Sequence, residues 1–521
     1  MTTFSFNALR EPWIPVVRQD GVLEEVGIHD CLARAHGLRE IRHPAPIVEF
    51  GMYRLLEAFV LDALIVAERR PDDIFDLKDL LKEEALCPEE IVRYEACCGD
   101  VFDLFHTERP FLQSVIAGDS WKPLAGLFPA VPSGTNALHW HHRHESALAV
   151  SPAEALRMLT TIAPFMTAGG AGLSPSINGA PALYVLPVGA NLFETLVLNL
   201  PLRQDQEGGK GVVAWRNSNA PGEARSQATM VEALTWRPRR IQLLPETEEG
   251  QPVYVRKMKF EKGDSTTFQW VDPNLAYKYD DQGRTPIRLR ENRPPWRDAG
   301  ALVLLREDAQ GKGERKQVFR RPDAMEQAFQ IVQGSEPVVL QIYGMRTDMK
   351  MKIFEWVKGV WKIPSTLGRS TRLGALVEAE LQKAEAGAQR LRRSIRALVP
   401  RELKPTSGEA KQKKPQGKKK KAPPKLKSVA DRCEHAFWQC MEPLFHRLMC
   451  AFAALRSDAP DDPDLMAATA REWRSTIALL ALEQFDLAAK DLDADSDALE
   501  RQVRARILLL GALKKILGEV K

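Results

Sequence analysis

Four amphipathic segments follow one another after residue 370, and they restrict this part of the chain to a helical fold. In each segment, apolar residues recur at i, i+3, i+4 and i+7, a spacing that places them on one face of a helix. The segments are residues 372–399, 428–455, 463–490 and, from a cap near residues 495–497, a fourth that ends at Leu517. The apolar stripe of the fourth segment comprises Leu499, Val503, Ile507, Leu510, Leu513 and Leu517. Four such stripes joined by loops predict a four-helix bundle over residues 366–521.

Residues 404–427 separate the first two predicted helices and are rich in lysine, proline and glycine. They hold ten of the 73 basic residues of the chain and one of its 69 acidic residues, so the remainder has a net charge of −5. Such a composition cannot bury a core, and we expect a disordered loop. A lysine run of this kind is usually a solvated tether, and weak DNA binding without sequence preference is the alternative role. Because the rest of the chain is slightly acidic, specific contacts with nucleic acid have to come from local basic patches.

Residues 1–365 predict one large mixed α/β region. Apolar residues at helical spacing predict a buried helix over residues 45–68. Ser151, followed by proline and then by glutamate at the third helical position, predicts a capped helix that ends at Thr160. The strands and helices do not follow a strict βαβ rhythm, which indicates an irregular α+β fold rather than a doubly wound sheet. Runs of β-forming residues between turns predict strands at residues 14–17, 182–188, 240–244, 252–260 and 301–305.

The apolar runs and the seven cysteines limit the compartment in which this protein works. No run approaches the ~20 apolar residues that span a bilayer, and the first residues lack the basic-then-apolar pattern of a signal peptide. The cysteines are odd in number and none lies in a Cys-x-x-Cys pair, which favours reduced thiols over disulfides or a zinc knuckle. We therefore expect a soluble cytoplasmic protein without a membrane partner.

Histidines cluster at residues 139–144, in the segment His-Trp-His-His-Arg-His. A metal site needs ligands that converge on one point, and only Glu145 stands beside this cluster. A polar and aromatic loop that contacts phosphates or bases fits the composition better than a metal centre does. A metal-dependent nuclease built on these histidines stays open as an alternative function.

Two further segments are compatible with nucleic-acid contact and with ordinary structural roles. Residues 167–172 are rich in glycine but lack the spacing of a dinucleotide fingerprint and the Lys-Ser/Thr of a P-loop. They form either a flexible turn or a backbone that approaches a nucleic-acid groove. Residues 254–262 alternate basic and apolar side chains, which fits an edge strand with a solvated face or a strand along phosphates. No hydrolase triad or nuclease signature stands out in the sequence, which argues against an enzyme.

Several short segments, taken in order, resemble the CasA family, the large subunit of the type I-E CRISPR Cascade. They are residues 11–16 (EPWIPV), 109–113 (RPFLQ), 132–136 (PSGTN), 235–241 (TWRPRRI) and a segment centred on Gly344. Each segment is short, and their common order along nearly the whole chain carries the resemblance. The resemblance implies a subunit, without catalytic residues or a cofactor, that inspects duplex DNA for a protospacer-adjacent motif.

Members of this family read the motif mainly from the minor groove, where the base code is degenerate. Two elements of the family enter the groove. The resemblance assigns the first, a glycine loop, to Gly169 and Gly170, with Gly170 the better match. It assigns the second, a lysine on a β-hairpin, to Lys262 or Lys259, because the alignment slips there.

A strand-separating wedge and a DNA-contacting loop are also implied by the resemblance. The wedge comprises Arg346, Asp348, Met349 and Lys350, and the loop comprises Asn136, His139, Trp140 and His141. Met349 stands where the family has a polar residue, and an apolar side chain can insert at a base step and unstack it. Relatives that bind zinc use paired cysteines, which this chain lacks, so we expect no metal.

The resemblance also implies partners. The bundle would pack on the small subunits and line the displaced DNA strand, while the crRNA-bearing backbone subunits complete the complex. A separate helicase-nuclease, recruited after R-loop formation, would perform the cutting. A stand-alone DNA-binding regulator is the second alternative function, and it would bind DNA tightly without other subunits. The phosphate contacts of the bundle fall on Arg369, Arg372, Arg390, Arg392, Arg393 and Arg396.

Overall fold

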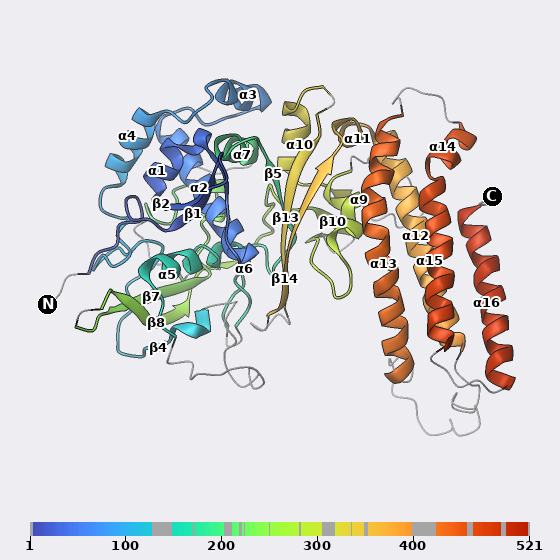
Figure 1. Cartoon of the computed structure of the whole chain (residues 1–521). Helices are drawn as coiled ribbons and strands as arrows, with labels where there is room; N and C mark the ends of the chain where they lie inside the picture. The colour runs from blue at the N-terminus through green and yellow to red at the C-terminus, as the bar shows by residue number, and fades with distance from the viewer. Residues whose placement is uncertain are drawn as a thin grey trace. The chain divides into compact units, whose positions relative to one another are not determined.

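The chain forms two compact units, which are described one by one (Figure 1). The first consists of Met1–Val303 with Asp308–Ile363, and the second of Leu304–Glu307 with Pro364–Lys521. The division after Ile363 lies next to the domain boundary expected at residue 365. The computed structural model describes residues 4–127, 148–169, 172–202, 211–217, 221–222, 224–249, 251–280, 283–304, 318–334, 336–347, 353–398, 424–455, 462–490 and 496–518.

The core of the first unit is built around the long helix α2 (Pro46–Val66). Every residue from Ile47 to Leu64 is buried, and Phe50 stacks on Tyr184 with ring centroids 4.4 Å apart. Gly51 makes a close approach possible, because a Cβ atom at this position would lie 2.6 Å from Oγ1 of Thr160. The helix predicted over residues 45–68 is therefore confirmed, and burial on all sides makes it the scaffold of this unit.

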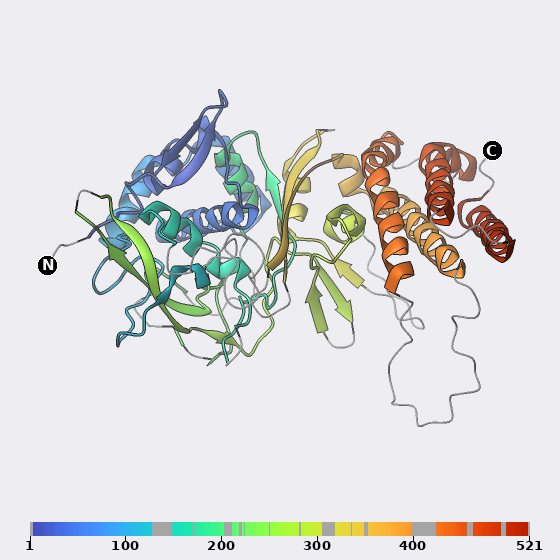
Figure 2. The same cartoon turned by 60° about the horizontal axis from the view of Figure 1, so that its bottom comes forward.

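Small sheets of two or three strands make up the β-structure in the described part of the first unit (Figure 2). The strands predicted at 14–17, 182–188, 240–244 and 252–260 are confirmed as β1, β5, β7 and β8. In sheet order the strands are β2 (Leu23–Val26), β1 (Ile14–Arg18) and β3 (Leu38–Ile41); β4 (Lys122–Pro123), β8 (Tyr254–Lys262) and β7 (Arg239–Glu246); β14 (Ile353–Ile363), β13 (Val338–Thr347) and β5 (Tyr184–Val188); β11 (Gly283–Pro286), β10 (Tyr277–Asp280) and β12 (Val318–Arg320); and β6 (Ala224–Arg225) with β9 (Ser265–Thr266).

Short helices connect these sheets. The side chain of Ser151 accepts a hydrogen bond from the amide of Glu154 at 3.1 Å, so the predicted cap of the helix before Thr160 is confirmed. The strand predicted at residues 301–305 is wrong, because Ala299–Leu302 is helical and fully buried. A short apolar run does not distinguish a buried strand from a buried helix. The helices are α1 (Ile28–Ala33), α3 (Ile74–Lys82), α4 (Pro88–Cys98), α5 (Pro152–Leu159), α6 (Ile162–Phe165), α7 (Leu192–Asn199), α8 (Met230–Leu234), α9 (Ala299–Leu302) and α10 (Asp323–Ile331).

The second unit is helical, as predicted. Its long helices α12, α13, α15 and α16 form the bundle, and α12 packs against the other three. Gly387 of α12 allows this packing, because a Cβ atom there would lie 2.8 Å from Cγ2 of Ile477. Helix α13 begins at Pro424, so the last residues of the segment expected as a loop are helical, while residues 404–423 lie outside the described part. The helices are α11 (Ser365–Arg369), α12 (Thr371–Ala397), α13 (Pro424–Ala453), α14 (Pro463–Thr469), α15 (Arg471–Lys490) and α16 (Ser496–Leu517).

Two details of the bundle differ from the prediction. The helix expected over residues 463–490 is broken at Ala470 into α14 and α15. On α16 the exposed fractions of Leu499, Val503 and Ile507 are 61%, 51% and 62%, so the stripe predicted there is only partly buried. The face that packs inward comprises Ala498, Ala505, Leu509, Leu513 and Leu517. Helical spacing identifies an apolar stripe, but it does not say which of two stripes the neighbouring helices cover.

No helix in the described residues combines the length and the apolar character that crossing a membrane requires.

Candidate nucleic-acid interface

The glycine-rich segment and the β-hairpin meet at one arginine, Arg239. Strands β7 and β8 pair antiparallel, and in their register Arg239 lies opposite Lys262. The guanidinium of Arg239 donates from Nη2 to the carbonyl of Thr167 at 2.8 Å and from Nη1 to the carbonyl of Ser174. These two carbonyls flank the glycine-rich loop on both sides. Arg239 therefore joins both ends of this loop to the end of the hairpin that carries Lys262.

Arg239 has an unusual electrostatic environment for a buried arginine. Its exposed fraction is 4%, and within the described residues its hydrogen bonds go to backbone carbonyls rather than to a carboxylate. Burial alone lowers the pKa of Arg239 to about 10, so the guanidinium remains charged at neutral pH. Three carbonyl acceptors offset part of the cost of removing this charge from water. The side chain is thus both a rigid clamp and a source of positive charge beneath the loop.

The loop itself requires glycine at one described position. Gly172 has φ +79° and nothing within 4 Å of a Cβ atom built on it, so its surroundings are open. This backbone conformation is readily adopted by glycine and strained for most other residues. Gly169 is described and partly exposed, whereas Gly170 lies outside the described residues.

The two candidate lysines on β8 have different environments. Lys259 is 6% exposed, donates from Nζ to the carbonyl of Ile116 at 2.9 Å, and lies 4.3 Å from the ring centroid of Trp121. Lys262 is the last residue of β8 and is exposed. A side chain whose ammonium is buried and bonded has to break these contacts before it can bind DNA. Of the two, the geometry therefore favours Lys262.

In the sequence, the expected wedge segment overlaps the end of strand β13 and precedes the start of strand β14. The two strands form an antiparallel hairpin in which Thr347 pairs with Ile353, and a register shift follows Arg346. Arg346 forms an ion pair with Glu355 at 2.6 Å and lies over the ring of Phe354 at 4.7 Å. Asp348, Met349 and Lys350 lie outside the described residues, within the connection of this hairpin. Of the expected wedge residues, the structure describes only Arg346, near the end of strand β13.

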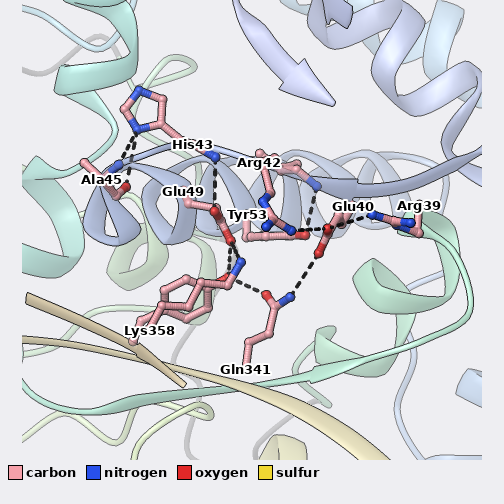
Figure 3. Close-up of polar contacts among 11 residues, drawn as sticks. Arg39, Glu40, Arg42, His43, Ala45, Glu49, Tyr53, Gln341 and Lys358 are labelled. Atoms are coloured by element: carbon pink, nitrogen blue, oxygen red, sulfur yellow. Dashed lines mark hydrogen bonds and ion pairs between the residues drawn. The ribbon is translucent and has the colours of Figure 1, made fainter. Parts of the chain in front are cut away.

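The root of this hairpin, the β13–β14 arm, is fixed to helix α2 by Glu49 (Figure 3). Tyr343 and Lys358 face each other across the hairpin, and both contact Oε1 of Glu49, at 2.6 Å and 2.5 Å. The other carboxylate oxygen accepts from the amide of His43 at 3.1 Å. Because Glu49 is only 1% exposed, its attraction to Lys358 is weakly screened by water. These contacts hold the arm at a position four residues before Thr347.

We expect Tyr343→Phe to lower the free energy of unfolding of the first unit by about 1–2 kcal/mol, because Glu49 loses a buried hydrogen bond. Urea unfolding followed by tryptophan fluorescence measures this change. Tyr254→Phe is the matched control, since the hydroxyl of Tyr254 contacts Glu248 on the surface and its loss should change little. Equal effects of the two substitutions would contradict a buried anchor at Glu49.

The arginines expected to contact phosphates lie on α12 and differ in their partners. Arg392 forms ion pairs with Asp431 and Glu434 of α13, so its charge already holds two helices together. Arg393 is exposed, as are Arg390 and Arg396. Arg393 is therefore the more accessible of the two candidate site residues.

Other predicted site residues cannot be placed. Asn136, His139, Trp140 and His141 fall within residues 128–147, outside the described part of the chain. In the described residues, no group of three histidine, cysteine, aspartate or glutamate side chains is arranged to hold a metal ion. The seven cysteines are free thiols in this structure.

Several motif residues prove to be structural rather than exposed to a ligand. Gln113 donates to the carbonyl of Leu104 at 2.7 Å and accepts from the amide of Leu243 at 2.7 Å. Trp13 donates to the carbonyl of Ala8 at 2.9 Å, and Gly344 permits Leu183 to pack within 2.5 Å of a Cβ position. Sequence reasoning missed Arg239 as a functional candidate. Arg239 lies within residues 235–241, one of the segments that carry the family resemblance, but the sequence assigned it no role of its own.

Comparisons with known proteins identify the family and the fold. A model of the family "CRISPR-associated protein Cse1" matches residues 7–484. The CRISPR-associated protein CasA/Cse1 of Thermus thermophilus is 29% identical over 489 residues, which cover 90% of this chain and 92% of the relative. A crystal structure of CasA from Thermus thermophilus has a TM-score of 0.74 at 24% identity and covers 98% of this chain and 100% of its own.

Two further structures have the same fold. Thermobifida fusca Cse1 matches with a TM-score of 0.76 at 21% identity, covering 98% of each chain. A chain of a CRISPR RNA-guided surveillance complex matches with a TM-score of 0.73 at 20% identity, covering 97% of this chain and 99% of its own. The resemblance to the CasA family is thereby confirmed. The family match extends over most of both units, and this chain belongs to the CRISPR-associated protein Cse1 family.

Proposed function

We propose that this chain is the large, non-catalytic subunit of a crRNA-guided Cascade complex and recognises the protospacer-adjacent motif of duplex DNA through the minor groove. Membership of the Cse1 family supports the subunit role, and a chain of similar fold belongs to a CRISPR RNA-guided surveillance complex. The chain works in the cytoplasm, and cutting is left to a helicase-nuclease that the DNA-bound complex recruits.

One observation carries the motif-reading role. Arg239 lies opposite Lys262 and bonds the carbonyls on both sides of the glycine-rich loop. Two segments about 90 residues apart in the chain, both implicated by the family resemblance, are thus held together by one buried side chain. An ordinary surface turn does not require such a clamp.

The chemistry of the two segments suits the minor groove. Glycines let a backbone approach the floor of the groove without a side chain in between, and a lysine can donate to the acceptors that A·T and T·A pairs share there. Because this code is degenerate, several motif sequences are accepted. Opening of the R-loop is nearly balanced in energy, so a few contacts at the motif decide whether unwinding begins.

Strand separation is assigned to the end of the β13–β14 arm, with Met349 as the apolar wedge. Inserting a side chain between base steps costs a few kcal/mol of unstacking, so the wedge has to be held rigidly. The anchoring of Tyr343 and Lys358 on Glu49 supports such a role.

Assembly with the crRNA-bearing backbone and small subunits is assigned to the bundle. Its helix α16 has a second apolar face, formed by Leu499, Val503, Ile507 and Leu508, that the described residues leave exposed. Exposed apolar faces of this kind occur where proteins bind other proteins. Arg393 and its exposed neighbours on α12 are left for phosphates of the displaced strand.

The experiment that tests this function measures duplex binding by the crRNA-loaded complex, rebuilt with and without this chain, on targets with intact and scrambled motifs. Binding to the intact target should depend on this subunit, and Gly170→Asp should lower the preference for the intact motif at least about tenfold, because a carboxylate is repelled by the groove. Gly37→Asp is the matched control, since Gly37 lies in open space on the same unit.

Other results would lead to other functions. If the complex binds equally well without this chain, the motif-reading role fails. Cleavage of DNA by the isolated chain with a divalent metal, abolished by His141→Ala, would establish the nuclease instead. Tight and specific binding by the isolated chain would establish the stand-alone regulator.

A further inference from the structure

A cavity in the first unit is lined in part by residues that directly follow the glycine-rich loop in the sequence. Its volume is about 310 Å³, at the lower end of the range of ~300–1,000 Å³ for small-molecule pockets. Its walls come from the turn that follows the loop, from the segment after β8, and from strand β11 and the residues behind it. The residues that carry the argument are Ser176, Asn178, Phe268, Trp270, Arg284 and Arg288.

The charge in this cavity is positive and uncompensated. None of its lining residues is an aspartate or a glutamate. Arg284 donates to the carbonyl of Gln269 at 2.5 Å. Arg288 makes no hydrogen bond or ion pair with the described residues, and its Nε atom is buried without a partner. Burial, with no carboxylate to oppose it, lowers the pKa of Arg288.

The contrast with other arginines removed from water shows what Arg288 lacks. Arg54 pairs with Asp272 at 2.9 Å, and Arg216 pairs with Asp62 at 2.8 Å. Arg239 has no carboxylate, but three backbone carbonyls accept its hydrogen bonds. A partly buried guanidinium without an anion costs stability, and such groups are common at sites that bind ligands. The missing anion is the first requirement on the ligand.

A second requirement comes from Asn178. Its Nδ2 donates to Asp272 at 2.9 Å and to the hydroxyl of Tyr184 at 3.2 Å, which fixes the orientation of the amide. Its Oδ1 is buried and has no partner among the described residues. A hydrogen-bond donor on the ligand, in addition to a negative charge, would satisfy this oxygen.

The third requirement is a flat apolar surface, because Trp270 and Phe268 form part of the wall. A lone phosphate would also leave most of the volume empty, since the cavity is about ten times the ~30 Å³ share of one water molecule. A nucleotide combines an anion, hydrogen-bond donors on its base and a flat ring that packs against aromatic side chains.

We propose that this cavity takes one nucleotide of the target DNA, with its phosphate at Arg288 and Arg284 and its base against Trp270. The proposal rests on the proposed function, because the DNA strand lying on the glycine-rich loop is the nearest source of such a group. Two lining residues connect the cavity to the elements described above. Ser174 accepts a hydrogen bond from Arg239, and Ser265 lies three residues after Lys262 in the chain. The strand that these elements contact thus passes the mouth of the cavity.

The test uses crRNA-loaded complexes that carry Arg288→Gln. Their targets are intact-motif duplexes with one neutral methylphosphonate, or one abasic site, at successive steps beside the motif. Arg288→Gln should weaken binding to unmodified DNA about tenfold, as expected for one lost charge-assisted contact. One methylphosphonate position should weaken the wild type by the same factor and leave the variant unchanged. An abasic site in that nucleotide should also weaken the wild type.

Arg18→Gln is the matched control, because Arg18 is an exposed cation paired with Asp20 at 2.9 Å outside the cavity. It should bind every target as the wild type does. The thermal midpoint of Arg288→Gln should be equal to or above that of the wild type, since an unpaired charge is removed from a partly buried position. A structural role for Arg288 would instead lower the midpoint.

The remaining outcomes each overturn the proposal. Unchanged DNA binding by Arg288→Gln shows that the cavity holds no nucleotide of the target. If dAMP raises the thermal midpoint of the wild-type subunit but not of the variant while DNA binding is unchanged, the ligand is a free nucleotide. If the methylphosphonate weakens DNA binding but the abasic site does not, the cavity binds only a phosphate and not the base. In all these cases the preference of the wild-type complex for the intact motif tests the proposed function separately.

Discussion

Replacing Arg239 with glutamine should abolish most of the preference for an intact motif, with a loss of about 100-fold in affinity for the intact target. Glutamine cannot reach the carbonyls of Thr167 and Ser174 together, so both ends of the glycine-rich loop are released. Each charge-assisted hydrogen bond contributes about 1.5–3 kcal/mol, and a loss of about 100-fold, about 2.7 kcal/mol, corresponds to one such bond rather than two, because the released loop can still be ordered by the DNA. Binding to scrambled targets should change little, because Arg239 is buried and touches no phosphate.

Competition binding of the assembled complex to intact and scrambled duplexes, repeated at several salt concentrations, measures both effects. The dependence of affinity on salt should remain that of the wild type, since no phosphate contact is lost. Arg239→Lys keeps the positive charge but lacks the planar guanidinium that donates to two carbonyls at once. It should therefore retain only part of the preference for the intact motif. Arg240→Gln is the control, because this neighbour on β7 pairs with Glu261 at 3.0 Å near the surface.

A parallel loss on intact and scrambled targets would contradict the role of Arg239 as a clamp. Such a result would instead assign Arg239 to general electrostatic attraction. The thermal midpoint of the isolated subunit distinguishes either case from a variant that no longer folds, since an unfolded variant would show no thermal transition.

The second large effect concerns Glu57, whose substitution by glutamine should stabilise the first unit by about 2–4 kcal/mol at alkaline pH and by much less at acidic pH. Glu57 is 2% exposed, its Oε1 has no partner among the described residues, and Arg54 lies 3.7 Å away. Arg54 is also bonded to Asp272 at 2.9 Å, so two carboxylates share one guanidinium. Burial raises the pKa of Glu57 to about 8, against the pull of Arg54.

The direction of the pH dependence follows from this raised pKa. The carboxyl binds a proton more tightly in the folded chain than in the unfolded one, so its contribution to stability is fully present below the unfolded pKa of about 4.5. This contribution is lost progressively as the pH rises from there through about 8, where Glu57 ionises in the core. Glutamine mimics the protonated form at every pH, so the variant should lack this loss.

Urea unfolding of both proteins at about pH 5 and about pH 9 measures the difference, because only the wild type has a proton to lose at residue 57 over this range. Equal slopes of stability against pH in the two proteins would mean that Glu57 is ionised throughout. Glu248→Gln is a suitable control, since Glu248 lies on the surface and contacts Tyr254 and Arg256.

Much of the secondary structure could be predicted because its causes are local. The helices over residues 45–68, 372–399 and 428–455 were identified from apolar spacing, and Ser151 from its capping sequence. The errors arose where local pattern is ambiguous. Residues 301–305 begin inside a buried helix rather than a strand, and the third helix of the bundle breaks at Ala470.

The candidate site could be predicted in part. Family resemblance assigned candidate roles to the glycine-rich loop, the lysine-bearing strand and the wedge segment, but it could not choose between Lys259 and Lys262. Their environments differ because Ile116 and Trp121, which lie far earlier in the chain, surround Lys259 alone. Neither Arg239, at the start of strand β7, nor Arg288, which follows strand β11, was singled out, since an arginine side chain usually reaches solvent.

The sequence by itself determined the α+β class, the helical C-terminal part, the Ser151 cap and the family, because these depend on periodicity and on residues close together in the chain. Only the tertiary structure decided which groups are buried and which remain without a partner. The charge of Arg288, the proton on Glu57 and the uncovered face of α16 depend on segments that folding brings together from distant parts of the chain. Burial raises the free energy of a charged group and makes an apolar surface stabilising. The local sequence pattern does not show which residues will be buried.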